Sequence, residues 1–217
     1  NDSLLILSTD KILLYQLTDS GYVFSKSIRM PVDGPGQIDL LSDKENILLN
    51  YTGPDWDKPF RNLVIDFNGD TVNSRINNYM YSKQGGPVTV IRTENIKFNF
   101  ENRPYFKEIY NDTIYTIDND NCFKPYLILD TERKAMKIRE RAKSRELDIT
   151  KFVVFWYIYE TSRYFLYDYS YEGSHHSVIL DKKQDIRYEL SSSGLLTDDI
   201  IGGIDFRPGY CSDDFLI

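Results

Sequence analysis

Short apolar runs alternate with polar turn residues along most of the chain. Four segments begin with turn-forming or polar residues and continue into an apolar run, at residues 1–8, 44–51, 111–118 and 162–169. A second apolar run follows each of them, at residues 11–17, 62–67, 125–130 and 177–181. Short apolar runs bounded by polar turns are typical of β-strands joined by hairpins. The pattern therefore predicts pairs of short strands over most of the chain.

The strand pairs recur at similar intervals. The centres of the second strands, Leu13, Val64, Ile128 and Ile179, follow one another at 51, 64 and 51 residues. Three of these strands close on an aspartate, and these are Asp66, Asp130 and Asp181. A repeat of about 50 residues built from short strands is typical of a β-propeller blade, whose two apolar faces must be covered by neighbouring blades. We predict one all-β domain over residues 1–217, a β-propeller with about four blades' worth of antiparallel strands. A β-sandwich is the alternative.

Two segments interrupt this repeat. The longer interval contains strand-like residues 86–93 and 96–106, which we interpret as an insertion. Residues 132–147 are the one helix candidate, because Ala135, Ile138 and Ala142 make a thin apolar stripe at helical spacing. Seven basic residues between positions 133 and 145 make this segment either a contact for an anion or a solvated helix face.

Composition supports a β-rich protein and excludes some partners. The chain has 17 tyrosines and 12 phenylalanines, and its only alanines are Ala135 and Ala142. The net charge of −7 gives no overall field that would attract nucleic acid or an anionic membrane. No apolar stretch approaches the roughly 18 residues of a membrane-spanning helix. Cys122 and Cys211 are interpreted as two separate thiols, with a single disulfide as the alternative.

Several phrases together resemble a known family. Residues 197–208 read TDDIIGGIDFRP, residues 160–169 read ETSRYFLYDY, and residues 34–36 read GPG. With NDTIYTI at 111–117, they resemble a family of bacterial six-bladed β-propeller proteins of uncharacterised function, TolB-like in shape. That family shows the phrase Asn-Asp-x-x-Gly-Gly-x-x-Phe-x-Pro near its end, with Asp198 here where Asn is usual. The matching residues are Asp199, Gly202, Gly203, Phe206 and Pro208.

The resemblance implies export to the periplasm or the cell surface, often with a lipid anchor. It also implies a chain longer than 217 residues. The sequence begins within a strand-like run without a visible signal peptide and ends on another such run. We therefore expect it to be a piece of the propeller, incomplete at both ends.

Three carboxylates around the glycine pair are the weak candidates for catalysis. Asp198, Asp199 and Asp205 could hold a cation or act as acid and base if the Gly202-Gly203 bend turned them toward a central channel. The alternative is a structural corner of Asx turns. The sequence predicts no cofactor and no metal site. The two histidines, His175 and His176, follow a turn and are interpreted as an exposed loop pair.

Aromatic residues are unusually dense between positions 152 and 171. In this segment Phe165, Tyr167, Tyr169 and Tyr171 alternate, so they share one face of a predicted strand. Tyrosine offers both an apolar ring and a hydroxyl, and such a row can stack on sugar rings or hold a peptide. The alternative is packing between neighbouring blades. Tyr167, Tyr169 and Tyr171 are our candidate binding residues.

These observations lead to an exported propeller that acts as a binding or scaffold module, with a glycan or a peptide as ligand. One rival is a glycan hydrolase or lyase that uses the carboxylates of residues 198–205. The other is a protein–protein assembly module that uses a flat propeller face. The binding module is the hypothesis that we favour over an enzyme.

Overall fold

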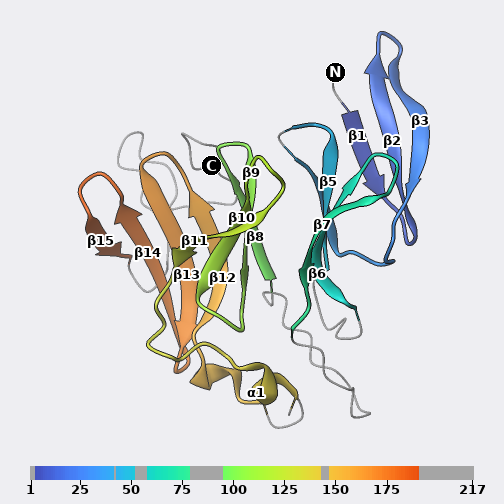
Figure 1. Cartoon of the computed structure of the whole chain (residues 1–217). Helices are drawn as coiled ribbons and strands as arrows, with labels where there is room; N and C mark the ends of the chain where they lie inside the picture. Colours follow the sequence, from blue (N-terminus) through green and yellow to red (C-terminus); the bar gives the residue numbers. More distant parts are fainter. Residues whose placement is uncertain (1–2, 42, 52–57, 79–94, 143–146, 191–217) are drawn as a thin grey trace. The chain divides into compact units, whose positions relative to one another are not determined.

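The computed structural model describes residues 3–41, 43–51, 58–78, 95–142 and 147–190, and nearly all regular structure in them is antiparallel β-sheet (Figure 1). The strands form one three-stranded and three four-stranded sheets. Sheet A contains β1 (Ser3–Leu7), β2 (Lys11–Thr18) and β3 (Gly21–Arg29). Sheet B contains β4 (Gln37–Leu40), β5 (Asn46–Asn50), β6 (Phe60–Asp66) and β7 (Thr71–Ile76). Sheet C contains β8 (Asn95–Phe100), β9 (Arg103–Glu108), β10 (Thr113–Ile117) and β11 (Phe123–Ile128). Sheet D contains β12 (Val154–Glu160), β13 (Tyr164–Tyr171), β14 (Ser174–Asp181) and β15 (Ile186–Glu189).

Every sheet is a meander in which strands that follow one another in the chain pair with one another. This is the connectivity of propeller blades, and the predicted fold class, an all-β β-propeller, is confirmed. The alternative of a β-sandwich is wrong, because the strands divide into separate small sheets rather than two facing layers.

The chain forms two compact units. Unit 1 comprises Asn1–Val90 with Ile117–Phe123, and it carries sheets A and B. Its core brings together apolar residues of both sheets, among them Ile12 and Ile28 with Leu49 and Leu63. In the described part of the chain, no helix is both long and apolar enough to cross a membrane.

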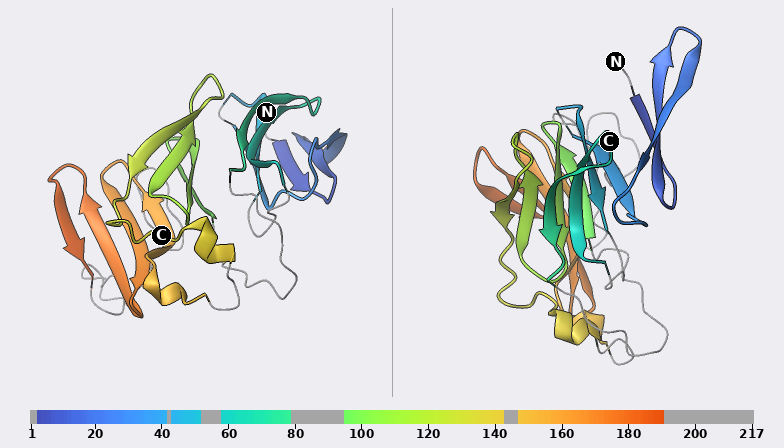
Figure 2. Two further views of the ribbon diagram at one scale, coloured as in Figure 1. Left: turned by 60° about the horizontal axis from the view of Figure 1, so that its bottom comes forward. Right: turned by 45° about the vertical axis from the view of Figure 1, so that its right-hand side comes forward.

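Unit 2 comprises Ile91–Thr116 with Lys124–Ile217, and it carries sheets C and D. The two sheets lie side by side, with β8 next to β12 (Figure 2). Their shared core contains Phe98, Phe155, Ile158 and Phe165, and the ring centroids of Phe98 and Phe165 lie 6.3 Å apart. The apolar side chains that form this core are thereby removed from water.

Burial falls from the middle of a sheet to its outer strand. The middle strands β5 and β6 of sheet B are buried at almost every position, so they read as continuous apolar runs. The last strands β11 and β15 are exposed along nearly their whole length. This gradient explains why the strands most visible in the sequence pattern are the central ones.

The structure contains the repeated strand pairs, but we predicted wrongly which strands of each sheet they are. Val64 and Ile179 both lie on third strands of their sheets, whereas Leu13 lies on the second strand of sheet A and Ile128 on the fourth strand of sheet C. In a meander any two consecutive strands look alike in sequence, so the pattern does not mark where a sheet begins. Residues 96–106 form the hairpin β8–β9 of sheet C and are no insertion, and residues 86–93 lie outside the described residues.

The predicted helix is much shorter in the structure. Helix α1 covers only Ile138–Ala142, and a 3-10 turn follows at Ile149–Lys151. Residues before α1 cannot continue it because Glu132 and Arg133 have φ angles of 53° and 67°. Ala135 instead forms a parallel β-bridge with Val153, which ties this segment to the entry of sheet D.

The recurring aspartates close turns. The Oδ1 atom of Asp66 accepts the backbone N–H groups of Asn68 and Asp70 at 2.7 and 3.0 Å. The Oδ1 atom of Asp181 likewise accepts hydrogen bonds from the backbone N–H groups of Lys183 and Gln184 at 2.9 and 3.1 Å. A carboxylate that binds backbone N–H groups two to four residues later makes an Asx turn, which reverses the chain after the strand.

Candidate functional site

A row of tyrosines follows one face of β13. Pairing in sheet D places Tyr167, Tyr169 and Tyr171 on the same side of the strand, with Asp168 and Ser170 on the other. The ring planes of Tyr167 and Tyr169 are 26° apart, with centroids separated by 6.1 Å. All three tyrosines are half-buried, while Phe165 at the inner end of the row is buried in the core.

These tyrosines border a cavity of about 410 Å³ within unit 2. One side is formed by β13 together with Phe155 of β12 and Arg187 of β15, and the other by the chain that leaves β11. The residues lining this cavity are Ile128, Leu129, Asp130, Thr131, Glu132, Lys134, Val153, Phe155, Tyr167, Tyr169, Tyr171 and Arg187. We call this site the tyrosine pocket. It combines aromatic surface with a few polar groups, as small-molecule sites usually do.

Phe155 connects the tyrosine pocket to the core. Its ring centroid lies 5.9 Å from that of Tyr167 and 5.9 Å from that of Tyr169. The Nζ atom of Lys107 also lies over the ring of Phe155, 4.6 Å from its centroid. Lys107 is buried, and its Nζ donates to the carbonyl oxygens of Glu108 at 3.1 Å and Asn111 at 2.8 Å. The aromatic surface is therefore fixed from behind by a buried cation and its backbone partners.

The segment that closes the other side is held by Thr131. Its hydroxyl donates to Asp112 Oδ1 at 2.8 Å and accepts the backbone N–H of Ala135 at 2.9 Å. The Nζ atom of Lys134 lies 4.6 Å from the ring centroid of Tyr171 and 3.3 Å from Glu132 Oε2. The pocket rim thus contains an ion pair that also contacts the last tyrosine.

The hydroxyls of Tyr167 and Tyr171 remain protonated at neutral pH. Burial raises the pKa of Tyr167, partly opposed by the positive charge of Arg187. Hydrogen bonding with Glu172 raises the pKa of Tyr171, and Lys134 acts in the opposite direction. Neutral hydroxyls can both donate and accept hydrogen bonds, so the row offers polar as well as apolar contacts to a ligand.

His176 belongs to the same surface, which the sequence interpretation missed. The histidines do not lie in a loop but in β14, where His176 is paired with Tyr169. The two rings are nearly parallel, with centroids 4.7 Å apart, and His176 Nδ1 lies 3.1 Å from Glu189 Oε1. Glu172 and Gly173 form a two-residue turn with φ angles of 51° and 78°. A tight hairpin at this Glu-Gly step would have placed His176 opposite Tyr169 from sequence alone.

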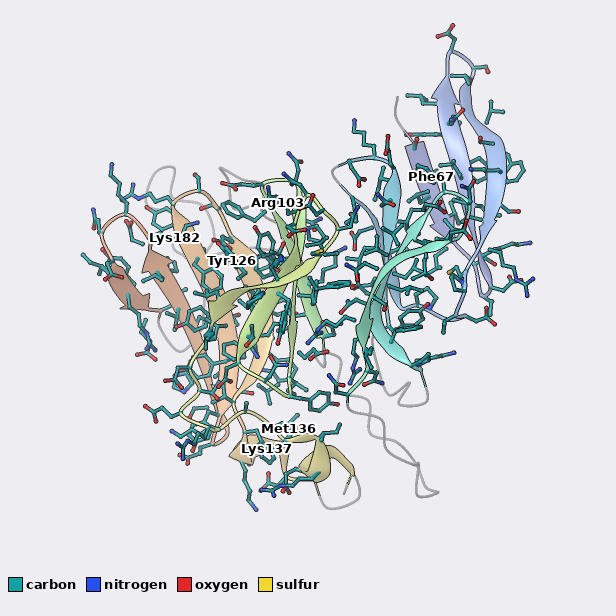
Figure 3. The ribbon with its side chains drawn as sticks, in the orientation of Figure 1. Phe67, Arg103, Tyr126, Met136, Lys137 and Lys182 are labelled. Carbon is teal, nitrogen blue, oxygen red and sulfur yellow. The ribbon has the colours of Figure 1, made fainter. Side chains whose placement is uncertain are left out.

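A second polar cluster joins sheets C and D. Glu160 is 1% exposed, and its Oε1 accepts hydrogen bonds from the Tyr126 hydroxyl at 2.6 Å and from Lys182 Nζ at 3.0 Å. Figure 3 labels Tyr126, which lies on β11, and Lys182, which directly follows β14. Lys182 also lies over the ring of Phe100, 4.5 Å from its centroid. The carboxylate of Glu160 thus has its hydrogen-bond partners within this chain. We therefore interpret the cluster as a contact that packs sheet C against sheet D.

The other candidates lie outside the described residues. These are Asp198, Asp199 and Asp205, and with them the motif residues Gly202, Gly203, Phe206 and Pro208. Cys211 also lies there, whereas Cys122 is a free, half-buried thiol. Among the residues that the structure places, no three or more His, Cys, Asp or Glu side chains gather as metal ligands would.

Solved structures resemble the chain over most of its length. A Bacteroides fragilis protein described as exported is 18% identical with a TM-score of 0.58, and the match covers 85% of this chain and 53% of that one. Virginiamycin B lyase from Staphylococcus aureus is 15% identical with a TM-score of 0.41, covering 85% and 54%. The chain thus spans about half the length of these structures.

Comparison with curated proteins gives no match. The likeness to the Bacteroides fragilis protein concerns the fold, since so low an identity does not carry an activity from one protein to another. A family model does match, over residues 1–217, and the chain therefore belongs to the family described as domain of unknown function DUF4934.

Proposed function

We propose that this protein is a propeller module that binds carbohydrate in the tyrosine pocket. The observation that carries the proposal is the row of Tyr167, Tyr169 and Tyr171, half-buried along one side of a cavity of about 410 Å³. Sugar rings have an apolar face of C–H groups and an edge of hydroxyls. A row of tyrosines complements both, because each ring offers a flat surface and each hydroxyl a hydrogen-bonding group.

Rigidity of the row supports this function. Tyr169 is held between Phe155 and His176, whose ring centroids lie 5.9 and 4.7 Å away. A ring fixed by its neighbours loses little conformational freedom when a ligand binds, so more of the contact energy becomes affinity. A ligand that stacks on Tyr169 would also exclude water from Phe155 at the base of the pocket.

The test is calorimetric titration of a panel of neutral oligosaccharides and of unrelated peptides. We expect one or more oligosaccharides to bind, and Tyr169→Ala to weaken that binding about tenfold or more. The matched control is Tyr22→Ala in sheet A, because Tyr22 is an exposed tyrosine of the other unit. Both variants should keep the circular dichroism spectrum of the parent. Peptide binding without glycan binding, or equal affinity in Tyr169→Ala, would refute the proposal.

A second part of the proposal concerns the full-length protein, which we expect to be longer than this chain, and its location in the cell. We infer that these sheets belong to a six-bladed, TolB-like propeller that is exported to the periplasm or the cell surface and anchored there by a lipid. The coverage of only 53% of the exported Bacteroides fragilis protein supports a longer chain, and that protein's description supports export. Cell fractionation of the full-length protein tests the location, and its structure tests the number of blades. Recovery in the cytoplasm, or a ring of another size, would overturn the respective part.

A further inference from the structure

Arg187 is a charged residue of the tyrosine pocket that has no role in the function proposed above. It lies on β15 opposite Leu180, which in turn lies opposite Phe165 on β13. Side chains directly opposite one another share a face of the sheet, so Arg187 lies on the same face as the tyrosine row. It is exposed, and it is one of the residues that line the cavity.

The other charged groups of the pocket already have partners in the chain. Glu132 and Lys134 form an ion pair, with 3.3 Å between Oε2 and Nζ. The carboxylate of Asp130 accepts the backbone N–H of Glu132 at 2.8 Å. Arg187, by contrast, takes part in none of the ion pairs found among the described residues. Within the part of the chain that the structure describes, its guanidinium is therefore available to a ligand.

The charge of Arg187 acts within the aromatic part of the pocket. Burial raises the pKa of Tyr167, the positive charge of Arg187 opposes this shift, and both residues line the same cavity. A ligand stacked on Tyr167 would therefore place its substituents next to a cation with several N–H donors. Such a guanidinium matches a carboxylate or a sulfate in both charge and geometry.

From this arrangement, and on the basis of the proposed function, we propose that the tyrosine pocket selects carbohydrates that carry an acidic group, which Arg187 binds while a sugar ring stacks on the tyrosines. Acidic sugars are disfavoured elsewhere on a chain of net charge −7. A cation at the stacking surface, without an ion pair among the described residues, would give this pocket a preference that the net charge of the protein opposes.

The experiment uses pairs of trisaccharides that differ only in the acid. These pairs are galacturonate with galactose, glucuronate with glucose, and mannuronate with mannose. Titration at low ionic strength should show that the acidic member of at least one pair binds about tenfold more tightly. Arg187→Gln should remove that preference, because it should weaken binding of the acidic member far more than binding of the neutral member. Lys183→Gln is the matched control, because it removes the same charge from the turn before β15 and should keep the preference.

The outcomes separate the two proposals. If neutral members bind as tightly as acidic ones and Tyr169→Ala weakens both, carbohydrate binding stands and acidic selection is wrong. If Arg187→Gln keeps the preference, or Lys183→Gln loses it equally, Arg187 is not the selecting group. If no member of any pair binds, neither proposal stands. Added salt should weaken binding of the acidic members alone.

Discussion

The hydroxyl of Tyr126 donates a hydrogen bond of 2.6 Å to the carboxylate of Glu160, one of the most deeply buried acidic groups in the described residues. Tyr126 lies on β11 of sheet C and Glu160 at the end of β12 in sheet D. Lys182 supplies the balancing charge at 3.0 Å from the same oxygen. A buried carboxylate without partners is strongly unfavourable, so this bond couples the packing of the two sheets to a specific polar contact.

Removal of this hydroxyl should therefore destabilise unit 2. Tyr126→Phe leaves the ring in place but takes one of two partners from a buried charge, and we expect a loss of about 1 to 3 kcal/mol in the free energy of unfolding. Urea unfolding followed by the fluorescence of Trp156 measures the change. The control is Tyr157→Phe, since Tyr157 is an exposed tyrosine of β12. Equal stability of the two variants would show that the bond contributes nothing.

Lys107 should make stability depend on alkaline pH. Burial lowers the pKa of its ammonium group to about 8, although Asp112 and Glu108 act in the opposite direction. Between pH 8 and the ordinary lysine pKa near 10.5, the unfolded chain holds the proton that the folded chain has released. The contribution of Lys107 to stability therefore rises with pH in this window, by about 3 kcal/mol at most.

The measurement is urea unfolding at several pH values between 7 and 9.5. The parent protein should show a rise that is absent from Lys107→Met, whose side chain does not titrate. Because Lys107 Nζ also binds two backbone carbonyl oxygens, Lys107→Met should be less stable at pH 9.5. Parallel pH profiles for the two proteins would contradict the lowered pKa.

Much of the fold could be predicted from local pattern, since a strand of a meander pairs with its neighbour in sequence. Alternation alone placed Tyr167, Tyr169 and Tyr171 on one face, and the pairing in sheet D confirms this arrangement. The phase of the repeat could not be predicted in the same way. Strands such as β10 and β11 resemble β5 and β6 in sequence, and only their pairing shows their positions within a sheet.

The pocket itself depends on contacts between distant parts of the chain. Its second side is the segment after β11, which the helical spacing of Ala135 and Ile138 led us to interpret as the start of a helix. Left-handed backbone at Glu132 and Arg133, with the bridge between Ala135 and Val153, turns this segment along sheet D instead. Propensity is a weak guide where tertiary contacts of this kind decide the backbone.

Gly69 should be far less tolerant of substitution than another glycine of similar conformation. Its φ angle is 90°, and a Cβ atom there would lie 2.4 Å from the carbonyl oxygen of Arg29. Gly173 has a φ angle of 78° with nothing within 4 Å of that position. Gly173→Ala therefore suffers only the backbone penalty of about 1 to 2 kcal/mol, and Gly69→Ala should lose clearly more. Thermal unfolding of both variants compares them, and similar melting temperatures would exclude the close approach.

Asp181 should contribute to stability in a pH-dependent manner on the acidic side. Arg163 holds the pKa of this carboxyl below its usual range, with its Nε and a terminal nitrogen at 3.0 and 2.8 Å. A folded-state pKa below the unfolded value means that the contribution is present above about pH 4 and is lost as the pH falls through the lowered value. Asp181→Asn should lower the melting temperature at pH 7 and show a smaller further loss on acidification. An identical acid profile in the parent and in Asp181→Asn would contradict this assignment.

The aspartate turns also bear on how such a chain acquires its structure. Asp66 and Asp181 bind N–H groups only two to four residues away, so each reversal is specified inside its own hairpin. Closure of a short loop costs little chain entropy, and meander pairing keeps nearly all strand contacts between neighbours in sequence. We therefore expect the hairpins of each sheet to form from contacts that are close in sequence, before the sheets pack against one another.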